Sequence, residues 1–155
     1  MTAPGDEQDA PRIIDVQVDV PGTPEEVWQA IATGAGVSAW LQHTEIEERE
    51  GGRFAFDMGE GYTLNETGTV SVWDPPYRFA TRDVQWRPEG EAAPAFLATE
   101  WTITARAGGG CTVRMVMSGF GRSDAWDDEL DAMKQGMSAA LERLRSHLVQ
   151  AARRT

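Results

Sequence analysis

The chain has 155 residues, in which 14 basic residues stand against 25 acidic ones, for a formal net charge of -11. That length suits one domain with a single core, and so negative a surface repels nucleic-acid phosphates and anionic lipids. No stretch approaches the ~18 apolar residues of a membrane-spanning helix. We therefore expect the protein to bind neither nucleic acid nor membrane. The single Cys111 has no disulfide partner, which fits a cytoplasmic protein.

The N-terminal region is predicted to consist of a tail and one strand. Residues 1–11, MTAPGDEQDAP, are small, acidic and proline-containing, which predicts a disordered tail. From Ile14 to Val20, β-branched residues alternate with polar ones, which is the pattern of a half-buried strand. Pro21-Gly22 is expected to end this strand.

Two short helices are expected next. Thr23 can cap the first, Pro24 occupies its first helical position, and Glu26 can complete a capping box. This helix is short because glycines follow from Gly34 onward. A second short helix is expected to carry Trp40 near its end.

From His43 onward the sequence predicts about six strands joined by turns. Glycines at 51–52 and 108–110 and prolines at 75–76 mark turns. Alternating apolar residues predict strands over about 53–58, 67–73, 77–86, 95–107 and 111–118, with a polar loop at 87–94. The strand charges alternate with apolar neighbours, so we expect Asp83, Glu100 and Arg114 to face solvent.

The last element is the clearest helix. Acidic residues fill its expected first turns, after a cap at Ser123 or Asp124. We expect it to end near Val149 and residues 150–155 to fray. Apolar residues recur along it at three- and four-residue steps and form one stripe: Leu130, Met133, Met137, Leu141, Leu144 and Leu148.

This order of elements predicts an α+β domain. Strands that neighbour one another in sequence form a meander, and the long helix needs the sheet in order to bury its apolar stripe. The expected architecture is a curved antiparallel sheet of about six to seven strands, with two short helices near the N-terminus and one long C-terminal helix. Such a meander leaves an interior that the helix need not fill.

Several short motifs occur in an order that resembles a known superfamily. They are the entry Thr23–Trp28, the turn Gly51–Phe54, the segment Gly68–Pro76, the pair Gly119-Phe120 and the helical Gln135–Met137. In this order they resemble the START-like, helix-grip superfamily called SRPBCC, and within it the bacterial branch that is similar to the C-terminal domain of the chaperone-ATPase activator. The resemblance covers about residues 13–148. It implies one helix-grip domain over 12–149, with a cavity between the sheet and the long helix.

Two departures from that superfamily limit what the resemblance implies. Cys111 and Met137 stand where its members commonly carry threonine and tryptophan, so the shape of a relative's pocket does not transfer. The chain also lacks the separate N-terminal domain through which the eukaryotic activator engages its chaperone. Chaperone activation is therefore not expected.

No catalytic signature is present in the sequence. Cys111, His43 and His147 do not match a Cys–His nucleophile motif, and there is neither a helical His–Glu pair for zinc nor a phosphate-binding glycine loop. We therefore expect no catalytic residue, no metal and no cofactor. His43, near the expected mouth of the pocket, is a candidate polar contact, although an ordinary loop histidine is the commoner case.

Methionine and tryptophan are the residues best suited to line a pocket in this chain. Both present large apolar surfaces, and methionine adapts to irregular shapes. Core packing is the commoner explanation for any one of them, but as a set they fit the cavity that the resemblance implies. The predicted wall consists of Phe54, Phe56, Trp101, Met115, Met117, Met133 and Met137, with Trp40 near the mouth.

The leading hypothesis is a protein that binds a small hydrophobic or aromatic molecule, lipids included, and acts as a carrier, a sensor or a sequestering (self-resistance) protein. One alternative is an enzyme of the polyketide cyclase or dehydratase kind, which requires an ionisable side chain inside the pocket. Another is a chaperone-interacting module, which requires a contiguous exposed apolar patch. The chain is expected to be a monomer or a weak homodimer.

Overall fold

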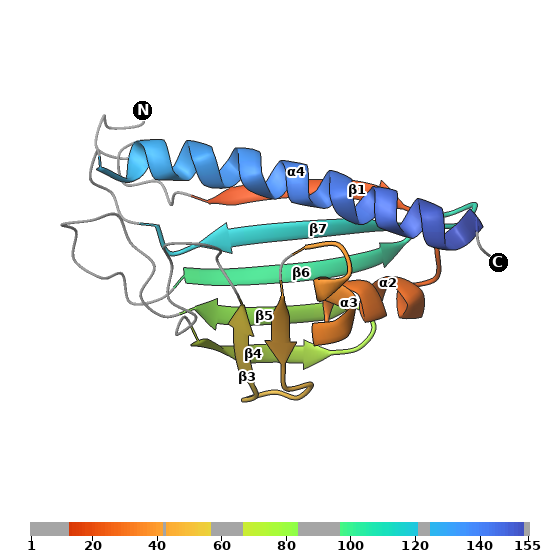
Figure 1. Cartoon of the computed structure of the whole chain (residues 1–155), viewed down its shortest axis with the longest axis horizontal. Helices are drawn as coiled ribbons and strands as arrows, with labels where there is room; N and C mark the ends of the chain where they lie inside the picture. The colour runs from red at the N-terminus through yellow and green to blue at the C-terminus, as the bar shows by residue number, and fades with distance from the viewer. Residues whose placement is uncertain (1–12, 42, 57–66, 84–96, 121–124, 154–155) are drawn as a thin grey trace, which may run out of the picture.

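The computed structural model of the chain describes residues 13–41, 43–56, 67–83, 97–120 and 125–153. It confirms the predicted α+β architecture, because seven strands form one curved antiparallel sheet and a long helix lies over one of its faces (Figure 1). The expected tail, the loop at 87–94 and the helix cap at 123–124 lie outside the described residues.

The elements follow the predicted order. The strands are β1 (Ile14–Val20), β2 (Thr44–Ile46), β3 (Arg53–Phe56), β4 (Thr67–Asp74), β5 (Arg78–Asp83), β6 (Leu97–Ala105) and β7 (Cys111–Ser118), and the helices are α2 (Pro24–Ile31), α3 (Gly34–Ser38) and α4 (Ala125–Arg153). The order across the sheet is β1-β7-β6-β5-β4-β3-β2, so β2 to β7 form a meander and β1 adds an edge strand beside β7. In Figure 1, β2 and β3 run across the direction of the other strands. The sheet therefore curls around the face that carries α4, called the inner face below.

The capping signals in the sequence set the start of α2. The Thr23 hydroxyl accepts a hydrogen bond from the Glu26 N–H at 3.2 Å, and the Thr23 N–H donates to the Glu26 carboxylate at 3.1 Å, which is the predicted capping box. The helix thereby presents Trp28 to the sheet, where its ring lies edge-on to Trp73 at 5.0 Å and to Phe79 at 6.1 Å between centroids. α2 and α3, below the C-terminal half of α4 in Figure 1, thus seal one end of the inner face. We call this the closed end.

Helix α4 is longer than the sequence predicted. It ends at Arg153 rather than near Val149, so residues 150–153 of the expected frayed tail are helical. Alanine has the highest helix propensity, and Ala151 and Ala152 extend the helix to Arg153, a cation that interacts favourably with the C-terminal end of the helix dipole. No helix in the described ranges is long and apolar enough to cross a membrane.

The outer face of the sheet carries ion pairs between neighbouring strands. The Arg114 guanidinium on β7 donates to the Asp15 carboxylate on β1, with 2.8 Å between Nε and Oδ1, and the Arg78 guanidinium on β5 donates to Glu100 on β6 at 2.9 Å. The hydrogen bonds from Arg114 lower the pKa of the Asp15 carboxyl below its usual range. The four side chains are 38–51% exposed to solvent, so each pair contributes little to stability.

The Asp15–Arg114 pair predicts a small acid-dependent loss of stability. A carboxyl whose pKa is lower in the folded chain stabilises the fold above its unfolded pKa of about 3.9, and this contribution disappears as the pH falls through the folded pKa. The urea midpoint of the wild type should therefore exceed that of Arg114→Gln at pH 7, and the difference should shrink progressively as the pH falls below about 4. Arg143→Gln, an exposed change on α4, controls for the lost positive charge. A difference that stayed constant down to pH 2.5 would contradict the assignment.

Candidate functional site

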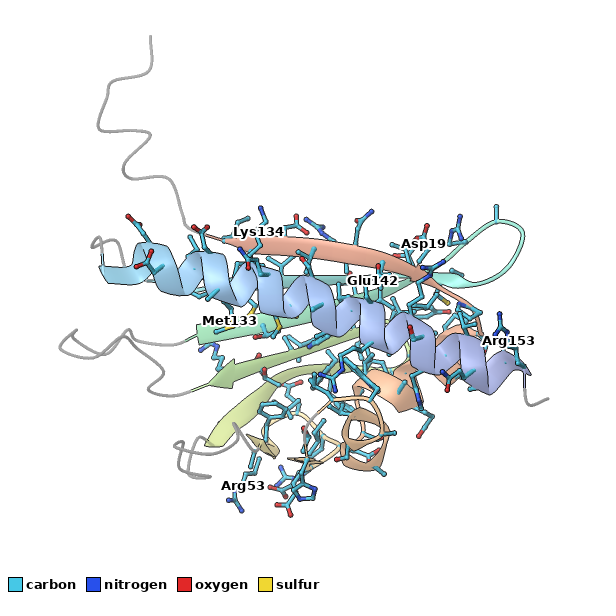
Figure 2. All side chains as sticks on the ribbon, turned by 45° about the horizontal axis from the view of Figure 1, so that its top comes forward. Asp19, Arg53, Met133, Lys134, Glu142 and Arg153 are labelled. Carbon is cyan, nitrogen blue, oxygen red and sulfur yellow. The ribbon has the colours of Figure 1, made fainter. Side chains whose placement is uncertain are left out.

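The apolar stripe of α4 runs along the whole helix, but its two halves are buried to different degrees. In the C-terminal half, the side chains belong to the core at the closed end and are 7% exposed or less: Ala140, Leu141, Leu144 and Leu148. In the N-terminal half, Leu130, Met133 and Met137 are only half-buried and pack against a second, smaller apolar cluster. In Figure 2 Met133 lies below α4, over the strands beneath the helix, and Lys134, which is exposed, lies above α4. The two halves of the helix therefore meet different surroundings.

The second cluster lies on the strands at the other end of the inner face. Its buried members are Ile14, Met115, Met117 and Phe120. Among the described strands, β1 is the one whose backbone α4 follows closely. Over β6 and β5, side chains alone span the distance between helix and sheet.

The strand register arranges the inner face in rows that cross the sheet. One row consists of Val16, Met115, Trp101, Phe79 and Trp73, and the next of Ile14, Met117, Thr99, Thr81 and Val70. In the first row Phe79 and Met115 are buried at 2% and 1% exposure, whereas Trp101 and Trp73 are only half-buried. Trp101 and Trp73 therefore leave part of their apolar surface exposed although they lie on the core-facing side of the sheet.

Two threonines lie in the middle of this apolar surface. Thr81 on β5 and Thr99 on β6 are directly paired across the two strands and are 3% and 8% exposed. Within the described part of the chain, neither hydroxyl makes a hydrogen bond. We call the surface formed by Trp73, Trp101, Met133 and Met137, together with these two threonines, the inner-face site. Alternation along β6 alone puts Thr99 on the side of Trp101, but no motif in the sequence points to a role for either threonine.

Five of the predicted wall residues lie together in the structure. Met115 and Met117 are buried in the second cluster, and Trp101, Met133 and Met137 pack against it. They come from β6, β7 and α4, so the fold brings together positions that the sequence separates by more than 30 residues. Whether they bind a ligand stays a prediction.

The remaining predicted residues lie elsewhere or outside the described side chains. Trp40 is buried, and its indole N–H donates to the Ala30 carbonyl at 2.8 Å, so it belongs to the packing between α2 and the segment after α3. Phe54 on β3 is half-buried against the closed-end core, and the side chain of Phe56 lies outside the described part. His43 is exposed, and its Nε2 lies 3.7 Å from the equally exposed Glu45 carboxylate.

One charged residue occupies a register position on the inner face. The expectation that Asp83 faces solvent is wrong in register, because Asp83 has the same parity along β5 as the buried Phe79 and Thr81. Its side chain lies outside the described part. Glu100 and Arg114 lie on the outer face, as expected, where they form the ion pairs described above.

The remaining reactive groups do not assemble into a second site. Cys111 is fully buried, its thiol lies 3.5 Å from the Gly22 carbonyl, and burial raises the pKa of that thiol, so it behaves as a small apolar residue. No three histidine, cysteine or carboxylate side chains of the described residues lie close enough to hold a metal ion. An open hollow of about 720 Å³ beside the β6–β7 turn is lined in part by ion-paired Asp19 and Arg106.

Comparison with known proteins places this fold in one family. The model of the family described as activator of Hsp90 ATPase homolog 1-like protein matches residues 21–149. Among curated proteins, none matches the chain in sequence.

Solved structures with the same fold have low sequence identity to the chain. Protein MLL2253 from Mesorhizobium loti aligns with a TM-score of 0.77 at 19% identity, over 90% of this chain and 98% of that one. The Aha1 dimer from Colwellia psychrerythraea aligns with a TM-score of 0.70 at 17% identity, over 88% and 95%. DynU16, a protein of the dynemicin biosynthetic locus, aligns with a TM-score of 0.72 at 24% identity over 90% of this chain, which spans only 48% of that protein. These matches show a shared fold.

Proposed function

The chain belongs to the family of activator of Hsp90 ATPase homolog 1-like proteins, and we propose that it uses this fold to bind a small hydrophobic or aromatic molecule between the sheet and α4. One observation carries the proposal. Trp73, Trp101, Met133 and Met137 are large apolar side chains that face the interior and are nevertheless only half-buried. A guest that covered them would remove this apolar surface from water, which is favourable in proportion to the area covered.

The chemistry of the wall favours a flat and adaptable fit. Indole rings present large faces for stacking, and thioethers are flexible enough to follow the outline of a guest. We propose a carrier, sensor or sequestering role, in the cytoplasm, for a monomer or a weak homodimer. The similar fold of the Aha1 dimer from Colwellia psychrerythraea supports the homodimer.

The binding proposal is tested with an uncharged aromatic probe. N-phenyl-1-naphthylamine should bind the wild type with a saturable rise in its fluorescence. Met137→Gln keeps the length of the side chain but places an amide in the apolar wall, so the affinity should fall about tenfold. Lys134→Gln, on the outward side of α4, should leave the affinity unchanged. The absence of saturable binding, or equal affinities in all three proteins, would contradict the proposal.

An enzyme of the cyclase or dehydratase kind is the second candidate. It needs an ionisable group inside the pocket, and the register position of Asp83 on the inner face supports it.

The chaperone-interacting module has less support. Among the described residues, the large hydrophobic side chains that are exposed are Ile13 and Tyr77. Ile13 precedes β1, and Tyr77 lies between β4 and β5, so β7 and β6 separate them in the sheet. They do not form the contiguous apolar patch that a docking surface for a chaperone predicts.

A further inference from the structure

The two threonines of the inner-face site have apolar neighbours in their own row and in the row of Trp101. In their own row, Thr99 has Met117 as its neighbour on β7, and Thr81 has Val70 as its neighbour on β4. In the adjacent row lie an indole and a phenyl ring, at Trp101 and Phe79. The hydroxyl pair is thus a polar spot bordered by apolar residues in its own row and in the row of Trp101, while Asp83 has the register position in the row on its other side.

A buried hydroxyl without a partner is energetically costly. Burial removes its hydrogen bonds to water, and this destabilises the folded state unless another group forms new ones. Nearly all buried polar atoms in native proteins therefore have a hydrogen-bond partner. No described side chain or backbone group bonds to the Thr81 and Thr99 hydroxyls, so a molecule that enters the site can supply the hydrogen-bond partner that the described residues do not.

We propose that Thr81 and Thr99 are the hydrogen-bonding element of the inner-face site, and that its ligand is a neutral aromatic or apolar molecule carrying a carbonyl or phenolic oxygen. This inference rests on the proposed binding function. The Cβ atoms of directly paired residues in neighbouring antiparallel strands lie roughly 4.5–5.5 Å apart, so two such hydroxyls can donate to one carbonyl oxygen or to two adjacent oxygens. The tryptophans and methionines around them then cover the apolar remainder of the ligand.

The charge distribution argues for a neutral ligand. In the described strands, every arginine occupies an outer-face position: Arg53, Arg78, Arg82 and Arg114. With a net charge of -11 and no cation in inner-face register within those strands, the site offers nothing to neutralise a carboxylate or phosphate. An anion would therefore lose its hydration without compensation.

The test compares two probes that differ in a single group. 2-Acetylnaphthalene and 2-isopropenylnaphthalene have the same flat outline, but the first carries C=O where the second carries C=CH₂. Titrations followed by quenching of tryptophan fluorescence should give about tenfold tighter binding of the ketone to the wild type, equal to about 1.4 kcal/mol. In a Thr81→Val/Thr99→Val variant, which removes both hydroxyls and keeps the shape, the two affinities should become equal through weaker ketone binding.

Thr104→Val is the matched control, because it makes the same chemical change on the exposed outer face of β6. It should retain the tenfold preference. If the wild type bound both naphthalenes equally, or if the double variant kept the preference, the role of the hydroxyls would be refuted while the binding function stood. If neither naphthalene nor N-phenyl-1-naphthylamine bound, the proposed function itself would be wrong, and this inference with it.

Discussion

Leu144→Ala is expected to lower the free energy of unfolding by about 3–5 kcal/mol, because Leu144 is fully buried in the core at the closed end. Against a typical domain stability of about 5–15 kcal/mol, this is a large share of the total. The protein that remains folded should bind N-phenyl-1-naphthylamine as tightly as the wild type, since Leu144 belongs to a different cluster from Met133 and Met137. Urea denaturation and probe titration of the same sample measure both quantities.

Leu130→Ala supplies the matched control for this prediction. It is the same substitution in the same helix, but Leu130 is only half-buried and packs against the second cluster. Its removal should cost less than about 1.5 kcal/mol in stability. Equal losses of stability in the two variants would show that the division of α4 into two halves is incorrect.

Gly36→Ala should also destabilise the protein strongly, by about 3 kcal/mol. A Cβ atom at residue 36 would lie 1.7 Å from the Gln29 carbonyl oxygen and 2.7 Å from the Thr33 hydroxyl. Neither neighbour moves freely, because the Thr33 hydroxyl donates to that carbonyl at 2.7 Å and accepts from the Gly36 N–H at 3.0 Å. The extra methyl group therefore has to push α3 away from the end of α2, which is the strain of an overpacked site.

Gly136→Ala should have the opposite effect and stabilise the protein by about 0.5–1 kcal/mol. Gly136 lies within α4 and is exposed, and nothing lies within 4 Å of the position that its Cβ would take. Alanine therefore improves helix propensity without a clash. Thermal and urea unfolding of both glycine variants measure the contrast, and a loss of stability in Gly136→Ala would contradict it.

Local signals in the sequence predicted most of the fold. The capping box at Thr23, the glycine turn at 108–110 and the alternation in β7 each determine backbone geometry through nearest neighbours, so they could be recognised without the structure. The end of α4 was misplaced because a run of alanines carries no stop signal, and helix ends depend on small differences in propensity.

The site was only partly predictable, because periodicity shows which side of an element is apolar but not what lies opposite. The stripe of α4 predicted that Met133 and Leu144 share a face, yet nothing in the sequence shows that one is half-buried and the other sealed. Thr81 and Thr99 escaped notice because threonine is common in strands, and their pairing depends on the register between β5 and β6. The inner-face register of Asp83 follows from the alternation along β5, in which Phe79 and Thr81 are buried.

The division of α4 has a consequence for how such proteins diversify. Substitutions at the half-buried apolar positions within residues 130–137 should cost little in stability, whereas the buried positions within residues 140–148 belong to a core that tolerates few replacements. Under the proposed binding function, a lineage could therefore exchange one ligand for another through substitutions in two turns of a single helix and remain folded throughout. The same two turns are the natural place to begin when this scaffold is redesigned to recognise a chosen molecule.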